Sequence, residues 1–391
     1  MKYNRFLECY RFYTRGNETP ELFHLWCGLS ALAGACEKRL WLDRGFFNVY
    51  FNLYVVLISP AGLCAKSSSL DLAGKLLKDA GYRLLEGSVL KEKIIIEMLE
   101  SMKTVQLDVE SIFPHCSVTY LSDELNVLLS SGVDMIKFLV DMYSKDDLYA
   151  YKTKNSGTFE LPYPYFNLLT AAVPQWFGPQ LAGDMASTGF LARCILIYLD
   201  QKRGKYPQPI YTKEQVDARA ECLEMLTSIA DWYGPLELSE SAKKFYDDWY
   251  MSQDISPSED YRIAAYLERR NKVHILKVAG LMAVGDLRKI IQKIDFERAI
   301  DLFKMTEKRL RMSYLIAGGN KLAQYVYKIQ GLLKDNGGKL YTKDLMKMFY
   351  TDLNPADFKI CLQTLVEMNE IELVQEKSTK LYYINKLKGE N

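Results

Sequence analysis

An apolar run that leads into a lysine-containing loop constrains the fold of this chain more than any other feature. The run "NLYVVLI" (52–58) predicts a buried strand, and "SPAGLCAKSS" (59–68) follows it directly. The next residues, through Gly81, have the apolar spacing of a helix. Strand, glycine-containing loop and helix in this order are typical of a phosphate-binding loop. A buried strand-to-helix turn that merely contains a lysine is the alternative.

The loop keeps part of the phosphate-binding pattern GxxxxGK(S/T). Ser59 and Ala65 occupy the two glycine positions, and alanine adopts left-handed backbone angles poorly. In such a loop the backbone N–H groups surround the phosphates, the lysine binds the terminal phosphates and the hydroxyl binds Mg²⁺. The strand before the loop and the serine-rich helix start after it favour this interpretation. We predict that ATP and Mg²⁺ are bound by Gly62, Ala65, Lys66, Ser67 and Ser68.

Two adjacent carboxylates follow a second predicted strand, in "VTYLSDEL" (118–125). We expect Asp123 to hold Mg²⁺ through water and Glu124 to polarise the water that attacks the phosphate. The alternative is a helix N-cap, in which Ser122 caps a helix and the acids lie in its first turn. The lysine loop upstream favours the catalytic interpretation.

Two further polar residues lie at the ends of later predicted strands. Thr170, near the end of "YPYFNLLTAAVP" (163–174), is placed to sense the γ-phosphate, or it simply ends the strand. Arg193 immediately precedes an apolar strand in "ARCILIYLD" (192–200). It is placed to act as an arginine finger on the ATP of a neighbouring subunit. A solvated arginine at a strand entrance is the alternative.

A β-hairpin is predicted between the carboxylates and the strand of Thr170. Alternation in "LYAYKTK", the turn "NSG" and the segment "TFEL" indicate two antiparallel strands, with Lys152 and Lys154 near the tip. Lysines on such a hairpin are suited to grip the phosphate backbone of DNA in the pore of a ring. An ordinary solvated hairpin is the alternative.

The composition limits the class of protein. Of 391 residues, 49% are hydrophobic and 25% charged, which is typical of a globular chain. The longest apolar stretch is shorter than the roughly 20 residues of a membrane-spanning helix, and the N-terminus lacks a signal-peptide core. We therefore expect a cytoplasmic protein without a membrane partner. The 8 scattered cysteines and 3 histidines favour neither a disulfide framework nor a zinc site. A net charge of +1 leaves a nucleic-acid partner open.

The order of predicted elements indicates an α/β protein with several segments. Helical spacing covers 4–40, and strands then alternate with helical segments. A polar stretch (200–215) and the glycine pair in "IAGGNK" mark two boundaries. The tail reads as three helices and two strands, an order that fits a winged helix. We predict an N-terminal helical region (1–45), a P-loop ATPase core (46–212), a helical lid (213–316) and a winged-helix domain (317–391).

Several of these segments together resemble a known family. "NVYFNLYVVLISPAGLCAKSS", "LSDEL", "YAYKTKNSGTFEL", "LLTAAVPQWF", "GFLARCILIY" and "RNKVHILKVAGLMAV", in this order, are similar to phage, prophage and plasmid replication proteins. Those proteins are helicase-like ATPases, often fused to a primase, and the glycine before their loop lysine is frequently replaced. "GFLARCILIY" is also similar to the arginine-finger segment of minichromosome maintenance helicases. The lysine hairpin resembles a hairpin of those enzymes and of superfamily III viral helicases.

The resemblance implies an AAA+-type core and the same roles for Lys66, Ser67, Asp123, Glu124, Thr170 and Arg193. It adds Arg270, in "RRNKVHILKVA", as a second sensor that contacts the γ-phosphate from the lid, with Arg269 as the adjacent candidate. His24 and Trp26 match the N-terminal pattern of the family, and we interpret them as packing residues. We expect any priming activity to come from a separate primase, because these segments leave no room for a primase domain.

The resulting hypothesis is an ATP-dependent ring helicase, a hexamer because the finger acts between subunits, that moves on single-stranded or forked DNA. One alternative is a P-loop ATPase that does not unwind, such as a loader or a nucleotide-gated switch. Another is an ATP-independent DNA-binding scaffold, which the altered glycines favour. The retention of Lys66, Asp123, Glu124 and Arg193 together argues against the scaffold.

Overall fold

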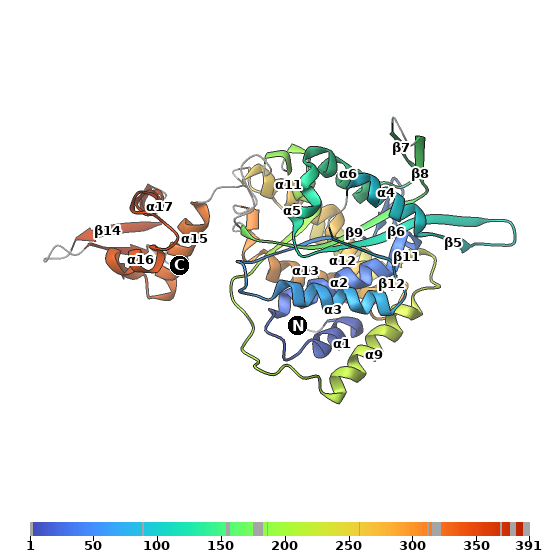
Figure 1. Ribbon diagram of the computed structural model, residues 1–391, viewed down its shortest axis with the longest axis horizontal. Helices are drawn as coiled ribbons and strands as arrows, with labels where there is room; N and C mark the ends of the chain where they lie inside the picture. Colours follow the sequence, from blue (N-terminus) through green and yellow to red (C-terminus); the bar gives the residue numbers. More distant parts are fainter. Residues whose placement is uncertain are drawn as a thin grey trace. The chain divides into compact units, whose positions relative to one another are not determined.

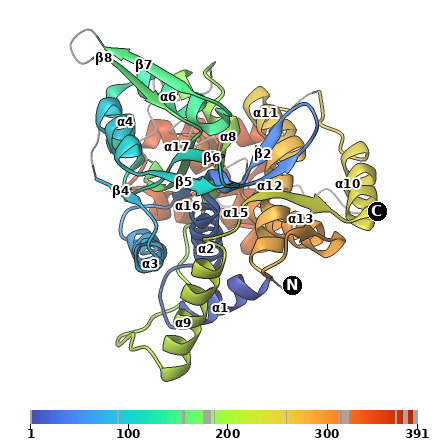
Figure 2. The same ribbon diagram turned by 90° about the vertical axis from the view of Figure 1, so that its right-hand side faces the viewer.

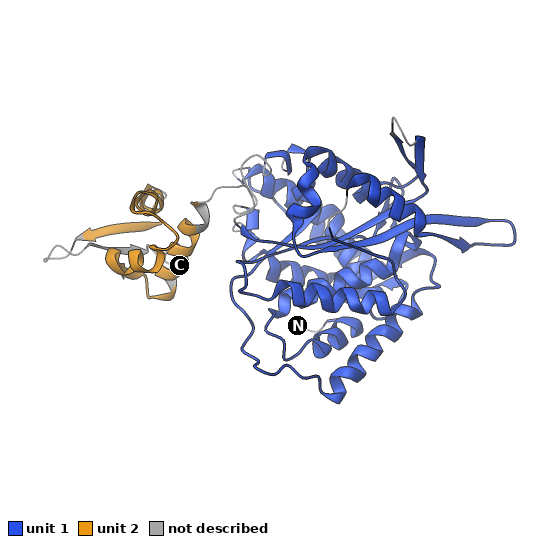
Figure 3. Ribbon diagram, viewed as in Figure 1, with its two compact units in different colours: residues 1–176, 181–314 blue, residues 177–180, 315–391 orange. Residues whose placement is uncertain are grey.

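The computed structural model describes residues 3–87, 90–153, 157–174, 183–185, 187–257, 259–310, 313–314, 322–367, 370–375 and 381–385. The chain forms two compact units, one of residues 1–176 and 181–314 and one of residues 177–180 and 315–391 (Figure 3). The segments predicted as 1–45, 46–212 and 213–316 lie in the first unit and share one hydrophobic core. None of the described helices combines the length and the apolar character needed to cross a bilayer.

A six-stranded sheet forms the centre of the first unit, in the order β10-β3-β9-β6-β4 with β5 added at β6 (Figure 1). The strands on that path run parallel, and β5 is antiparallel to β6. Strands covered on both faces read as continuous apolar runs, which is why β3 and β9 could be recognised. The α/β class is confirmed. The bounds are Tyr54–Ile58 (β3), Leu84–Glu86 (β4), Met102–Gln106 (β5), Ile112–Ser122 (β6), Pro164–Ala172 (β9) and Cys194–Tyr198 (β10).

Helices cover both faces of this sheet. On one face lie α2 (Glu21–Cys36) and α3 (Lys66–Asp79), and on the other lie α5 (Leu125–Leu128) and α6 (Val133–Ser144) (Figure 1). The alternation along β9 follows this arrangement, since Asn167 hydrogen-bonds to Ser30 of α2 whereas the ring of Phe166 meets Phe138 of α6. Among the described residues this part of the chain also contains α4 (Lys91–Glu100) and α8 (Phe190–Arg193).

A further helical layer packs on α2 and explains why that helix is apolar on all sides. It contains α1 (Arg5–Tyr13), α9 (Lys213–Ser228), α12 (Ile275–Val284) and α13 (Lys293–Glu307). His24 and Trp26 are both buried, and the indole N–H of Trp26 donates to the Thr306 hydroxyl of α13 at 2.9 Å. Their interpretation as packing residues is confirmed.

The segment 213–316 is not helical throughout, so that prediction was wrong in part. It contributes β11 (Gly234–Leu238) and β12 (Ile290–Ile291) to a four-stranded sheet with β1 (Leu40–Asp43) and β2 (Asn48–Tyr50), in the order β12-β11-β1-β2. Strands this short carry too little periodicity to be recognised among helices. The segment also holds α10 (Glu240–Met251), α11 (Tyr261–Arg269) and a π-helical turn, Arg270–His274.

The second unit has three helices and a three-stranded sheet of order β13-β15-β14, in which neighbouring strands are antiparallel. Its own hydrophobic core includes Ile329, Leu345, Phe358 and Cys361. The predicted helices and two strands are confirmed, and β13 was missed because it is only 3 residues long. The bounds are Ala323–Asp335 (α15), Lys339–Tyr341 (β13), Thr342–Phe349 (α16), Pro355–Glu367 (α17), Ile371–Gln375 (β14) and Leu381–Asn385 (β15).

Candidate functional site

The C-terminal ends of the parallel strands meet at one edge of the central sheet. Ile58 at the end of β3 is level with Ala172 of β9 and Tyr198 of β10. The loop 59–65 leaves from this edge, and the pair 123–124 follows the C-terminal end of β6. In parallel sheets, ligands bind outside the carboxyl ends of the strands. Two motifs that are separate in the sequence therefore lie at the edge where a ligand is expected.

The loop 59–65 contains two residues with left-handed backbone. Gly62 has φ 70°, and Ala65 has φ 45° and ψ 47° immediately before α3 begins. Alanine thus adopts the conformation that sequence reasoning regarded as difficult, at a cost of about 1 kcal/mol. The Thr19 hydroxyl donates to the carbonyl oxygen of Ala65 at 2.9 Å and helps to hold this turn.

The ammonium nitrogen of Lys66 donates to the carbonyl oxygen of Ser59 at 2.8 Å. Burial lowers the pKa of the Lys66 amine, and the Coulombic effects of Cys64 and then of Asp123 oppose this shift. The first turn of α3 has no side-chain cap, although the N–H of Ser68 donates to the carbonyl oxygen of Ala65 at 3.1 Å. A helix N-terminus without a side-chain cap can bind an anion. Ser67 and Ser68 are exposed beside it. The predicted phosphate-binding residues are therefore gathered around an uncapped helix N-terminus.

The strain at Ala65 makes a testable prediction. We expect Ala65→Gly to raise the free energy of unfolding by about 1 kcal/mol without loss of Mg-ATP affinity, because glycine adopts φ 45° freely. Urea unfolding measures the first quantity and calorimetry the second. Ala80→Gly, at the other end of α3 where φ is −82°, is the matched control and should destabilise the protein. A destabilising Ala65→Gly would contradict the strain argument.

The carboxylate pair is placed as predicted but does not cap a helix. Both Asp123 and Glu124 are exposed, and the Ser122 hydroxyl accepts from the N–H of Glu124 at 3.2 Å. Glu124 itself occupies the N-cap of α5, with no side-chain cap bond, so the alternative of a Ser122 cap was wrong. Among the described residues no three His, Cys, Asp or Glu side chains gather as metal ligands. Ser67 and Asp123 fit Mg²⁺ nonetheless, because this ion takes few protein ligands together with phosphate and water.

Thr170 lies deeper in the sheet than predicted. It is fully buried, and its hydroxyl donates to the carbonyl oxygen of Ser122 at 2.9 Å. Strand β9 continues to Ala172, so Thr170 stands inside the ladder and not at its end. In this structure Thr170 links the carboxylate strand to its neighbour, and a contact with a γ-phosphate stays a prediction.

Arg193 lies at the opposite edge of the sheet. It precedes Cys194, which is level with Tyr54 at the start of β3, about 13 Å along the strands from Ile58 at the end of β3. Its Nη1 donates to the carbonyl oxygen of Gly189 at 3.0 Å, and its Nε is buried without a hydrogen-bond partner in the described part of the chain. Burial, followed by the charge of Arg269, lowers the pKa of Arg193. A partly buried guanidinium held in this way favours an anion supplied from outside.

The cations around Tyr143 extend this positive edge. The guanidinium carbons of Arg193 and Arg269 lie 6.0 and 5.7 Å from the centre of the Tyr143 ring. The buried Lys277 ammonium lies 3.9 Å from the same centre and donates to the backbone and side-chain oxygens of Asn52 at 2.7 Å. Arg269 is thereby grouped with Arg193 and not with the lysine loop of the same chain.

Arg270, predicted as a second sensor, is engaged elsewhere. Its Nη1 forms a 2.5 Å ion pair with Glu307, and its guanidinium also donates to Asn271. Sequence reasoning missed a different arginine, Arg309, which follows α13 and forms an ion pair with Asp200 just after β10. The Cys64 thiol in the loop donates to the carbonyl oxygen of Leu199 at 3.7 Å, next to Asp200, so the ion pair of Arg309 with Asp200 lies near the loop. No motif marks this residue.

The predicted hairpin is confirmed as β7 (Tyr149–Thr153) paired with β8 (Gly157–Leu161) (Figure 2). Lys152 pairs with Thr158 near the tip and is exposed. Lys154 lies outside the described residues. Because β8 leads directly into the start of β9, the hairpin belongs to the same amino-terminal edge as Arg193.

The site therefore consists of a lysine loop and a carboxylate pair at one edge of the sheet, with Arg193 and Arg269 at the other. This arrangement can bind a phosphorylated ligand at one edge and offer cations to a second molecule at the other. No protein-family model matches this chain and no curated protein gave a match, so the function must be inferred from the geometry of these residues.

Proposed function

We propose that this protein is an AAA+-type P-loop ATPase that forms a ring, a hexamer, and uses ATP hydrolysis to move along single-stranded DNA in the replication of a mobile element. The observation that carries the ATPase part is the meeting of the lysine loop and the carboxylate pair at the carboxyl edge of β3 and β6. Neither motif is complete by itself, and their spatial association supports reading both together.

The proposed hydrolysis is an in-line attack of water on the γ-phosphate. Glu124 is exposed at the end of β6 and orients the water as a general base. Lys66 exchanges its contact with the Ser59 carbonyl for the phosphate oxygens and neutralises their charge. Mg²⁺, held by Ser67 and Asp123, would supply further charge neutralisation when bound.

The ring part of the proposal is supported by the place of Arg193. A finger at the amino-terminal edge is separated from the lysine loop of its own chain by the length of β3, about 13 Å, whereas a neighbouring subunit can bring its nucleotide to it. A guanidinium without a carboxylate partner retains its capacity to bind phosphate. Arg269, beside the same Tyr143 ring, is the second candidate for this contact.

The second unit has the helix and strand order of a winged helix, and its surface favours protein contact over base reading. Its third helix, α17, carries one cation, Lys359, among acidic and neutral residues. Ile360 on the same helix is 50% exposed, and Leu373 of β14 is 46% exposed. A DNA-reading helix is expected to be richer in Lys and Arg.

DNA dependence of hydrolysis tests the motor. We expect single-stranded DNA to stimulate Mg-ATP hydrolysis several-fold, and Lys152→Ala to reduce this stimulation without changing the rate in the absence of DNA. Lys304→Ala, at an exposed lysine paired with Asp301, is the control and should behave as wild type. A hydrolysis rate that does not change when DNA is added would favour a nucleotide-gated switch over a translocating motor.

A further inference from the structure

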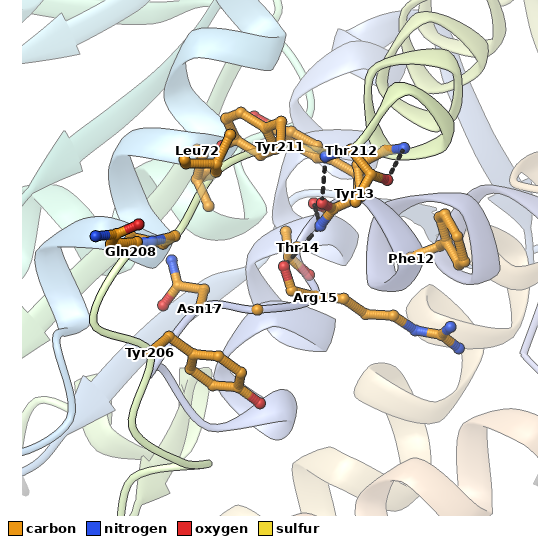
Figure 4. Close-up of a pocket in the computed structure, with 14 residues that line it drawn as sticks. Phe12, Tyr13, Thr14, Arg15, Asn17, Leu72, Tyr206, Gln208, Tyr211 and Thr212 are labelled. Carbon is orange, nitrogen blue, oxygen red and sulfur yellow. Dashed lines mark hydrogen bonds between the residues drawn. The ribbon is translucent and has the colours of Figure 1, made fainter.

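We propose that a pocket between the N-terminal loop and the segment after β10 binds the base of a purine nucleotide. This inference rests on the proposed binding of ATP phosphates at the lysine loop, and it assigns the base-recognising residues. The pocket has a volume of about 500 Å³ and is lined by the end of α1, the loop after it, one residue of α3 and the segment 206–215 (Figure 4).

The walls of the pocket offer aromatic faces. Tyr206 and Tyr211 line it and remain 37% and 49% exposed. Tyr211 is held in place by stacking on Tyr13, with ring centres 5.5 Å apart and an angle of 20° between planes. Bases stack favourably on such tyrosine faces. Exposed rings beside a pocket fit a flat aromatic ligand better than they fit an aliphatic one.

The polar groups of the pocket include the neutral amides of Asn17 and Gln208. Figure 4 shows the side chains of Asn17 and Gln208 close to each other on the side of the pocket near Tyr206. The Asn17 carbonyl oxygen accepts from the N–H of Thr19 at 2.8 Å, which leaves its NH₂ group to face a ligand. Amides supply both donors and acceptors, as the edge of a purine requires. Arg15 also lines the pocket, where its guanidinium carbon lies 4.6 Å from the centre of the Phe12 ring.

The pocket is joined to the phosphate loop on two sides. Leu72, which lines it, stands six residues after Lys66 on α3, about 9 Å along the helix axis. The loop that supplies Asn17 continues to Thr19, whose hydroxyl donates to Ala65. A phosphate chain on the loop and a base in the pocket are therefore separated by a distance that a ribose can bridge.

The opposite wall is tied to the same loop. The backbone carbonyl of Glu18 accepts from the N–H of Arg203 at 2.9 Å, and its carboxylate pairs with Lys202 at 2.7 Å. These contacts hold the segment after β10 against residues 16–19, so the two walls of the pocket are held next to each other. A base between the walls would stabilise the contact of Thr19 with the left-handed Ala65, and so would favour the phosphate-binding form of the loop.

Calorimetry on the full chain with two probes, Mg-ATP and Mg-tripolyphosphate, tests the proposal. Wild type should bind Mg-ATP more tightly than Mg-tripolyphosphate. Tyr206→Ala and Gln208→Ala should weaken Mg-ATP binding, the first by about tenfold, and leave tripolyphosphate unchanged. Gln208 is exposed, so its variant should fold normally. Lys66→Ala should weaken both probes.

The outcomes separate the two proposals. The base pocket would be overturned if wild type bound both probes equally, or if Tyr206→Ala and Gln208→Ala bound both probes as wild type does. In either case, weaker binding of both probes by Lys66→Ala would still support the phosphate site. Full Mg-ATP affinity in Lys66→Ala would overturn the proposed function and this inference with it. Replacing ATP by CTP or UTP should reproduce the loss seen in Tyr206→Ala, since a smaller ring stacks less well.

Discussion

Glu124→Gln is expected to lower the rate of Mg-ATP hydrolysis by about 10²–10⁴-fold and to leave Mg-ATP binding intact. The amide keeps the size of the carboxylate but cannot accept a proton from the attacking water. Because Glu124 is exposed and makes no side-chain cap bond to α5, the substitution should leave the fold unchanged. Lys66→Ala should differ, with loss of binding and hydrolysis together, since it removes the ammonium that neutralises the phosphates.

Steady-state phosphate release and calorimetric Mg-ATP binding, measured on the same preparations, distinguish these variants. Glu110→Gln, at an exposed glutamate between β5 and β6, is the matched control. Undiminished hydrolysis in Glu124→Gln would exclude this residue as the general base. Binding of Mg-ATP without hydrolysis in wild type would leave the loop as a nucleotide sensor and would favour the switch.

Arg193→Ala is expected to lower hydrolysis by about 10³–10⁵-fold, and mixing with Glu124→Gln should restore part of the activity. Each Arg193→Ala subunit keeps an intact loop and carboxylate pair but presents no finger. Each Glu124→Gln subunit keeps the finger but cannot hydrolyse. Where Arg193 of a Glu124→Gln subunit faces the nucleotide of an Arg193→Ala subunit, the site between them contains an intact loop, an intact carboxylate pair and a finger. Restoration therefore requires that the two edges of the sheet belong to one composite site.

The mixture is assayed at a fixed total concentration over a range of ratios, and the excess over the sum of the two variants is the signal. Arg219→Ala, which removes an ion pair with Asp79, is the control arginine and should retain activity. Arg309→Ala lies beside the loop of its own chain, so any loss it causes should not be restored by Glu124→Gln. A mixture no more active than its components would contradict action between subunits.

Local patterns were sufficient for the elements around the lysine loop. β3 and α3 follow from an apolar run and helical spacing, and β7 with β8 follows from alternation around a turn. The roles of residues whose positions depend on how the strands pair were harder to predict from the sequence. Sequence shows that Thr170 is near a strand end, but only the pairing of β9 with β3 shows that two more residues lie in the ladder.

Long-range contacts account for the other differences. Arg269 and Arg270 are adjacent in sequence, yet one lies over Tyr143 and the other pairs with Glu307, which no spacing predicts. Arg309 meets Asp200 across the fold, and the base pocket combines residues 12–17 with 206–215. β12 consists of 2 residues and exists because β11 is there to pair with it.

The two glycine replacements in the loop also bear on the thermodynamics of nucleotide binding. A glycine-rich loop samples many conformations before phosphate arrives, and ordering it opposes binding entropically. With serine at position 59 and alanine at position 65, fewer conformations are open, and the left-handed turn already exists before a ligand is present. The folded loop is therefore slightly strained, and it should lose less chain entropy when a ligand binds. Affinity in such a loop should depend less on temperature than in one that must first become ordered.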